Sequence, residues 1–84
     1  MARKYKSFPL VCIEWEDHSA DSGWVEVEDM SDMGIRCKTV GWLVKETPES
    51  YHIVDTLTDD EGQGGYSHIL RPCVIEVKTL RKNY

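Results

Sequence analysis

The sequence predicts a single, small, mostly β domain, namely a five-stranded barrel of the SH3-like or Sm-like kind with at most one short helical turn. Three observations lead to this prediction. Apolar and polar residues alternate with the period of a strand over most of the chain. Short clusters of glycine, proline and acidic residues separate these segments. A chain of 84 residues has a small core, and a barrel removes the exposed strand edges that cause aggregation.

The expected organisation is a basic tail over residues 1–7, the barrel over residues 8–80 and a frayed C-terminal tail over residues 81–84. The segment Ile35 to Glu46 is too long for a flat strand in a small domain. Gly41 in its middle predicts a bend where a side chain would clash. The five strands are expected at Val11–Trp15, Cys37–Lys45, His52–Leu57, Ser67–Leu70 and Ile75–Val77.

Turn-forming residues divide the strands. Pro48 sits in a short turn after the long strand, and the run from Asp59 to Gly65, with three glycines, predicts a hairpin loop. Pro72 breaks the chain before the last strand because it cannot donate a ladder hydrogen bond. In that last strand Ile75 and Val77 are expected to point inward.

The charge is −5 and is unevenly spread along the chain. Residues 14–32 contain eight acidic residues and no lysine or arginine. General nucleic-acid binding needs a basic stripe, so this balance disfavours it. The acidic stretch is either a solvated surface or a docking face for a basic partner, and the sequence leaves both interpretations open.

No metal or cofactor is expected. The three cysteines, Cys12, Cys37 and Cys73, are widely spaced and odd in number, which predicts buried free thiols rather than a disulfide framework. The sequence lacks the closely spaced cysteine or histidine pairs of a zinc site. Two of its histidines, His52 and His68, are expected to face solvent or the mouth of the barrel.

The protein is not expected to be an enzyme. Ser67 and His68 are neighbours on a strand and therefore point to opposite faces. The acidic run Asp59–Glu61 lies in a glycine-rich loop, whereas a catalytic acid needs burial to shift its pKa. The glycines at 64 and 65 lack the lysine and the following helix of a phosphate loop.

Candidate contact residues come from the aromatic and charged side chains. Trp15 and Trp42 are expected in the core, whereas Trp24 lies outside any clear strand and is the expected exposed anchor for a partner. Several cations, including Lys45, could hold the phosphates of a nucleotide. The candidate partner or ligand contacts are Trp24, Asp17, His18, Glu26, Glu28, Arg36, Lys38 and Arg71.

The chain resembles a group of small uncharacterised proteins encoded by tailed phages and prophages. The similarity rests on the strand from Cys37 to Glu46 with its Thr-Val-Gly-Trp sequence, on the acidic and glycine-rich hairpin, and on the valine-rich last strand that ends at Leu80. Where those proteins have a proline after isoleucine, this chain has Leu70, and Pro72 comes slightly later. The resemblance implies a viral origin and no catalytic residue.

Three functions follow as hypotheses. The first is a phage accessory protein that binds and blocks a host protein. The second is an oligomeric small barrel that sequesters a nucleotide-like ligand, and the third, disfavoured by charge, is an Sm-like nucleic-acid binder.

The expected location is the cytoplasm of the host cell, because no apolar stretch could span a membrane. A dimer or small ring is also expected, because so small a core leaves little stability. The segments Tyr51–Leu57 and Tyr66–Leu70 are the candidate surfaces, since both carry apolar residues on two faces.

Overall fold

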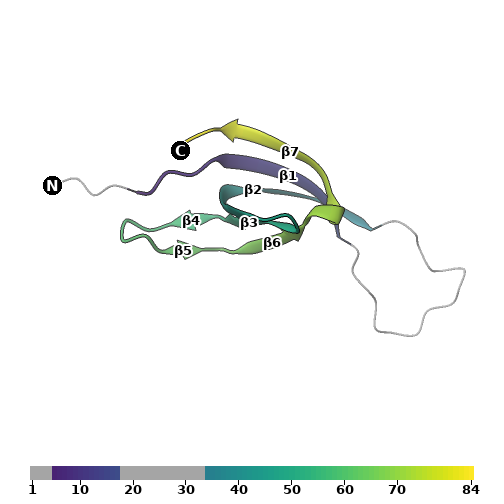
Figure 1. Cartoon of the computed structure of the whole chain (residues 1–84), viewed down its shortest axis with the longest axis horizontal. Helices are drawn as coiled ribbons and strands as arrows, with labels where there is room; N and C mark the ends of the chain where they lie inside the picture. The colour runs from purple at the N-terminus through teal and green to yellow at the C-terminus, as the bar shows by residue number, and fades with distance from the viewer. Residues whose placement is uncertain (1–4, 18–33) are drawn as a thin grey trace, which may run out of the picture.

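The computed structural model describes residues 5–17 and 34–84, which form seven strands and one short 3₁₀ helix (Figure 1). The mostly β fold with a single helical turn is therefore confirmed for this part of the chain. The elements are β1 (Leu10–Asp17), β2 (Ile35–Glu46), β3 (Ser50–Val54), β4 (Thr56–Leu57), β5 (Gln63–Gly64), β6 (Ser67–Leu70), η2 (Arg71–Cys73) and β7 (Val74–Arg81).

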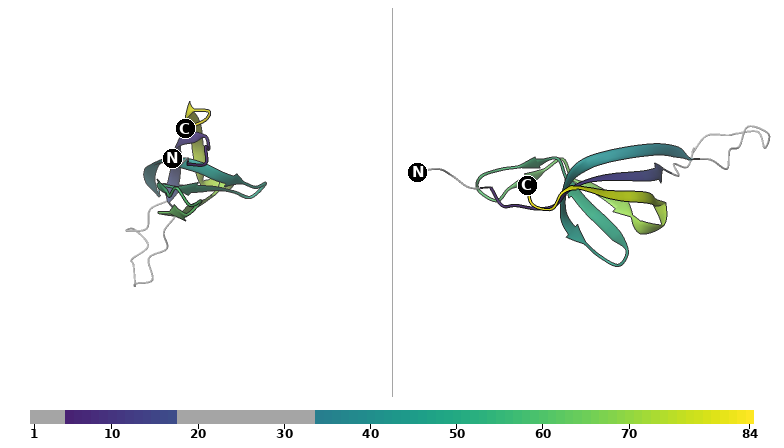
Figure 2. Two further views of the ribbon diagram at one scale, coloured as in Figure 1. Left: turned by 90° about the vertical axis from the view of Figure 1, so that its left-hand side faces the viewer. Right: turned by 90° about the horizontal axis from the view of Figure 1, so that it is seen from above.

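Five of the strands form one antiparallel sheet in the order β6-β3-β2-β1-β7, and β4 and β5 form a separate two-stranded hairpin. The two outermost strands, β6 and β7, follow one another in the chain and are joined by η2. The sheet curls, so that β7 lies outside β1 and β6 lies outside β3 (Figures 1 and 2). Within residues 5–17 and 34–84 no pairing between β6 and β7 closes the sheet.

The long strand β2 serves both halves of the sheet, as its length predicts. Residues 35–42 pair with β1, and residues 42–46 pair with β3, with a register shift between Leu43 and Lys45. Gly41 stands where the two halves meet. A Cβ built on it would lie 2.5 Å from Ile53 Cγ2 and 2.6 Å from the carbonyl oxygen of Val54. The close backbone approach expected at this glycine is thus confirmed.

The core lies on the inner face of the curled sheet. Val11 and Ile13 on β1 meet Ile53 on β3 and Ile69 on β6, and all four are buried. Alternation along each strand sends every second side chain to this face. Larger, partly buried side chains pack around the four: Trp15, Leu43, Tyr51, Val74 and Val77.

Two details of the predicted strands are wrong. The segment His52–Leu57 is not one strand, because β3 ends at Val54 and Thr56 already belongs to the β4–β5 hairpin. Ile75 does not point inward, and it is 44% exposed. A register shift between Glu14 and Trp15 leaves Ile75 without a partner on β1, so the simple alternation of β7 is broken there.

The acidic loop between β4 and β5 is held by its own hydrogen bonds, as turn chemistry predicts. The Thr58 hydroxyl donates to the Asp60 carboxylate and accepts the backbone N–H of Gly62. The hydrogen bonds from Thr58 and from the Gly62 backbone lower the pKa of Asp60. Glu61 between them has a positive φ of 70°.

The C-terminal residues, expected to be a frayed tail, make specific contacts. Arg81 is the last residue of β7, and the Tyr84 backbone N–H donates to the Phe8 carbonyl. The Tyr84 ring stacks on Trp42, with centroids 6.2 Å apart. None of the helical structure in the described residues is long or apolar enough to cross a membrane.

Candidate functional site

Half of the candidate contact residues lie in a part of the chain that the structure does not describe. Trp24, His18, Glu26 and Glu28 fall within residues 18–33, so the expected aromatic anchor and most of the acidic stretch stay predictions. Asp17 is described: it is the last residue of β1 and lies opposite Ile35.

The cations of β2 lie on the outer face of the sheet, beside a carboxylate. Arg36 Nη1 lies 3.9 Å from Glu14 Oε1, and Lys38 is directly opposite Glu14 in the β1–β2 register. A shallow hollow of about 220 Å³ continues from Lys38 past Glu14 to Glu76 and Lys78 on β7. Because positive and negative side chains both line this hollow, its electrostatic attraction for a phosphate group is weak.

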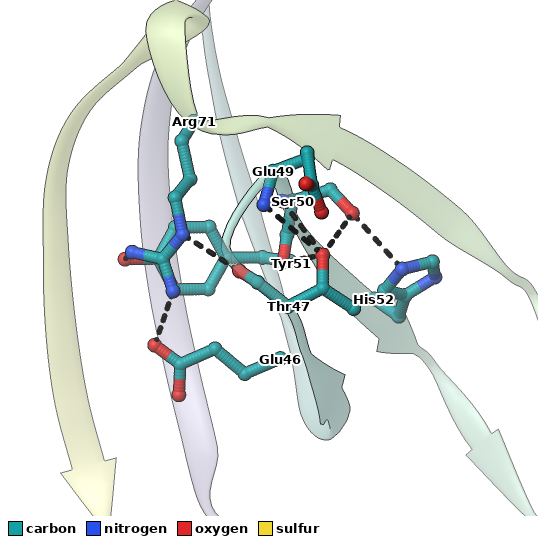
Figure 3. Close-up of polar contacts among 7 residues, drawn as sticks. All are labelled: Glu46, Thr47, Glu49, Ser50, Tyr51, His52 and Arg71. Carbon is teal, nitrogen blue, oxygen red and sulfur yellow. Dashed lines mark hydrogen bonds and ion pairs between the residues drawn. The ribbon is translucent and has the colours of Figure 1, made fainter.

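Arg71, the last of the candidate contacts, has a different role, which Figure 3 shows. Its Nε donates to the Thr47 carbonyl, its Nη1 to the Tyr51 hydroxyl and its Nη2 to the Glu46 carboxylate, each at 2.8 Å. The guanidinium also lies over the Tyr51 ring, 4.4 Å from its centroid. Arg71 therefore ties η2 to the β2–β3 turn, and few of its N–H groups are left for a ligand.

A chain of polar side chains leaves that turn along the outer face of β3 (Figure 3). The Thr47 hydroxyl accepts the Ser50 backbone N–H and lies 3.1 Å from the Ser50 hydroxyl. Ser50 Oγ lies 3.0 Å from His52 Nε2, and His52 Nδ1 lies 2.5 Å from the Tyr66 hydroxyl. The imidazoles of His52 and His68 stack with centroids 4.7 Å apart. Both ring nitrogens of His52 are thus hydrogen-bonded.

The environment of His52 disfavours its charged form. Partial desolvation, then the positive charge of His68 and then that of Lys45 lower the pKa of His52 below its usual 6.5. An unfolded chain has a histidine of ordinary pKa, so it binds more protons than the folded chain in the window just below 6.5.

Folding stability should therefore fall as the pH is lowered through that window. We expect the melting temperature to decrease between about pH 7.5 and about pH 5.5, with the decrease partly due to His52. A His52→Gln variant, which keeps hydrogen-bonding groups but cannot titrate, should show a smaller decrease in thermal melts. An equal decrease in the variant and the wild type would assign the effect to other groups.

Sequence reasoning left this histidine pair unconnected, because the expected hairpin loop is centred on a different residue from the observed pairing. In a hairpin, paired residues have numbers with a constant sum. The predicted loop from Asp59 to Gly65 centres on residue 62, whereas the observed pairs, His52 with His68 among them, have a sum of 120 and centre on residue 60. The same sum pairs Ser50 with Leu70.

Trp42 is not in the core, contrary to expectation. It pairs with Leu10 on the outer face, and its Nε1 donates to the Tyr84 carbonyl at 3.0 Å. With Tyr5, Leu57 and Tyr84 it lines an apolar hollow of about 390 Å³. Trp15, by contrast, packs against the core as expected and donates its Nε1 to the Thr39 hydroxyl.

The edge strands of the sheet are the places where a partner could add a strand. β3 pairs with β2 on one side and with β6 on the other over Tyr51–Ile53, so this part of the expected surface Tyr51–Leu57 offers no edge, contrary to expectation. β6 has a partner on one side only in the described structure. Tyr66, just before β6, is 61% exposed, and Leu70 at its end is 49% exposed. A strand with one unpaired edge, flanked by exposed apolar side chains, is a site where another chain can add a strand.

The described residues were also compared with the expectations for metal ligands and cysteines. Among residues 5–17 and 34–84, no three His, Cys, Asp or Glu side chains converge to hold a metal ion. The cysteines Cys12, Cys37 and Cys73 are free and only partly buried. Comparisons of the chain with protein-family models, with curated proteins and with solved structures find no match.

Proposed function

We propose that the protein is a non-catalytic accessory protein of the phage or prophage type that binds a host protein and blocks it. The observation that carries this proposal is the β6 edge. Among residues 5–17 and 34–84, Ser67–Leu70 pairs only with β3, and exposed Tyr66 and Leu70 flank the open side. Backbone hydrogen bonds to such an edge give affinity, and pockets for alternate side chains give specificity.

The fold and the resemblance support the same proposal. The sheet order, with the two edge strands consecutive in the chain and joined by a 3₁₀ turn, is the arrangement that a curled sheet needs to approach closure. We assign the domain to the SH3-like or Sm-like small barrels on this basis. From the resemblance to tailed-phage proteins we propose that the partner is a protein of the host-cell cytoplasm.

The alternative, sequestration of a nucleotide-like ligand, has less support from the geometry. It needs cations that converge on phosphate oxygens. Arg71 donates to three groups of its own chain, and Arg36 lies beside Glu14. Binding to nucleic acid in the Sm-like manner is disfavoured further by the charge of −5.

The test compares the wild type with Leu70→Glu, which places a charge at the β6 edge. Each protein is immobilised and exposed to lysate of the bacterial host, and the retained host protein is identified, purified and titrated. We expect the wild type to bind it and inhibit its activity, and the variant to bind at least about tenfold more weakly.

Val40→Glu is the matched control, because Val40 is an exposed apolar residue on the internal strand β2. It should bind as the wild type does. Equal loss in both variants would disprove the edge, and a purified partner whose activity is unaffected would disprove the blocking function. A thermal shift with nucleotides and no bound host protein would favour the alternative.

A further inference from the structure

The second edge of the sheet, β7, has properties that β6 lacks. It is eight residues long and pairs only with β1 in the described structure. Figure 1 shows it along the outside of the sheet. Its pairing with β1 is regular over Glu76–Thr79, between two register shifts. This regular stretch is the part of the edge that another strand can follow.

The charges on β7 are poorly matched within the chain. Glu76 lies directly opposite Glu14 on β1, and like charges in that position destabilise a strand pair. Lys78 lies opposite Cys12, which offers it no charge. In the described part of the chain, neither Glu76 nor Lys78 has an ion-pair partner. A strand on the open side that brought a lysine to Glu76 and a carboxylate to Lys78 would correct both mismatches.

A second copy of β7 is such a strand. When two copies pair antiparallel about a twofold axis at Val77, Glu76 of each faces Lys78 of the other, and Val77 faces Val77. Ile75 lies at the register shift, outside the regular stretch, so the matched pairs extend over Glu76–Lys78. Val77 packs against the core, so the two core faces become continuous.

The neighbouring registers are all worse. If the second copy shifts along β7 by two residues, Glu76 of one copy faces Glu76 of the other, or Lys78 faces Lys78. If the second copy shifts by one residue, side chains that point to opposite faces of the sheet are paired. The core face of the second copy then lies on the opposite side of the joined sheet from that of the first. The pattern of charges therefore specifies one register.

We propose that β7 is a homodimerisation edge, at which two copies of this chain pair antiparallel about Val77 with reciprocal Glu76–Lys78 contacts. This goes beyond the binding of a host protein, which uses the opposite edge. The interface is small, so we expect a weak, concentration-dependent dimer that weakens further with added salt.

The test is the oligomeric state of charge variants in sedimentation experiments over a range of concentrations. The wild type should be a dimer at high concentration. Lys78→Glu and Glu76→Lys should each weaken the dimer at least about tenfold, because each sets like charges together twice. The double variant Glu76→Lys/Lys78→Glu, which has the same composition and net charge as the wild type, should dimerise again.

Mixing the two single variants gives a second readout. The Glu76→Lys chain then carries two lysines on this edge and the Lys78→Glu chain two glutamates, so a heterodimer regains complementary pairs and should form in preference to either homodimer. Hydrogen exchange provides a check that needs no variant: amides of β7 should become more protected as concentration rises, and those of β6 should not. A wild type that stays monomeric, or a dimer that the single variants leave unchanged, would overturn the proposal.

Discussion

Replacing Gly41 by alanine is expected to lower the free energy of unfolding by about 3 kcal/mol. The added methyl group would lie 2.5 Å from Ile53 Cγ2 and 2.6 Å from the Val54 carbonyl oxygen. Both distances are far below van der Waals contact. Ile53 belongs to the buried core cluster, and Val54 is buried as well, so neither neighbour can move without opening the contact between β2 and β3.

Gly64→Ala is the matched control for this substitution. A Cβ at Gly64 would have the Thr56 Cβ as its nearest neighbour, at an ordinary 3.8 Å. We expect this variant to change the free energy of unfolding by less than about 1 kcal/mol. Urea denaturation of both variants measures the difference. Equal effects of the two substitutions would show that the close approach at Gly41 is not what fixes the bend.

Gly41 also illustrates why the mostly β character and the bent strand could be predicted from the sequence. A glycine in the middle of a twelve-residue β-prone segment is a local signal, and the strand it belongs to does bend between two pairing partners. The alternation that places Val11 and Ile13 in the core is local in the same sense. The alternation of a strand and the residues of a turn both involve neighbouring positions, so the location of most strands could be inferred from the sequence.

The wrong expectations concern features set by distant parts of the chain. Ile75 is exposed because the register of β7 on β1 shifts, and the alternation along β7 carries no sign of that shift. Trp42 sits on the outer face because β2 must send Gly41 inward between Val11 and Ile53. Once Gly41 faces the core, alternation sends its neighbour out.

The features of the candidate site also depend on pairings between distant segments. The histidine pair depends on the register of β3 and β6, because the predicted loop centres on residue 62 whereas the strands pair about residue 60. The contacts of Arg71 could not be read from the sequence, because they join residues 20 to 25 positions apart. The charge mismatch between Glu76 and Glu14 likewise needs the register of β1 and β7.

Arg71→Ala is expected to destabilise the protein by about 2–3 kcal/mol, the second large effect. The substitution removes three hydrogen bonds from a charged donor group and leaves the Tyr51 hydroxyl and the Thr47 carbonyl without this partner. Both acceptors are part-buried, so losing a partner costs more than it would in water. The ring of Tyr51 also loses the cation above it.

Arg71→Lys should recover less than half of that loss. A lysine keeps the charge near Glu46, but its single ammonium cannot reproduce a planar fork that reaches Thr47, Tyr51 and Glu46 together. Arg36→Ala is the control, because the Arg36 side chain is 68% exposed and has one ion pair at 3.9 Å; it should cost less than about 1 kcal/mol. Urea denaturation of the three variants ranks them. If Arg71→Ala lowers the free energy of unfolding no more than Arg36→Ala does, then Arg71 does not fasten η2 to the β2–β3 turn. Arg71 would then again be a candidate ligand contact.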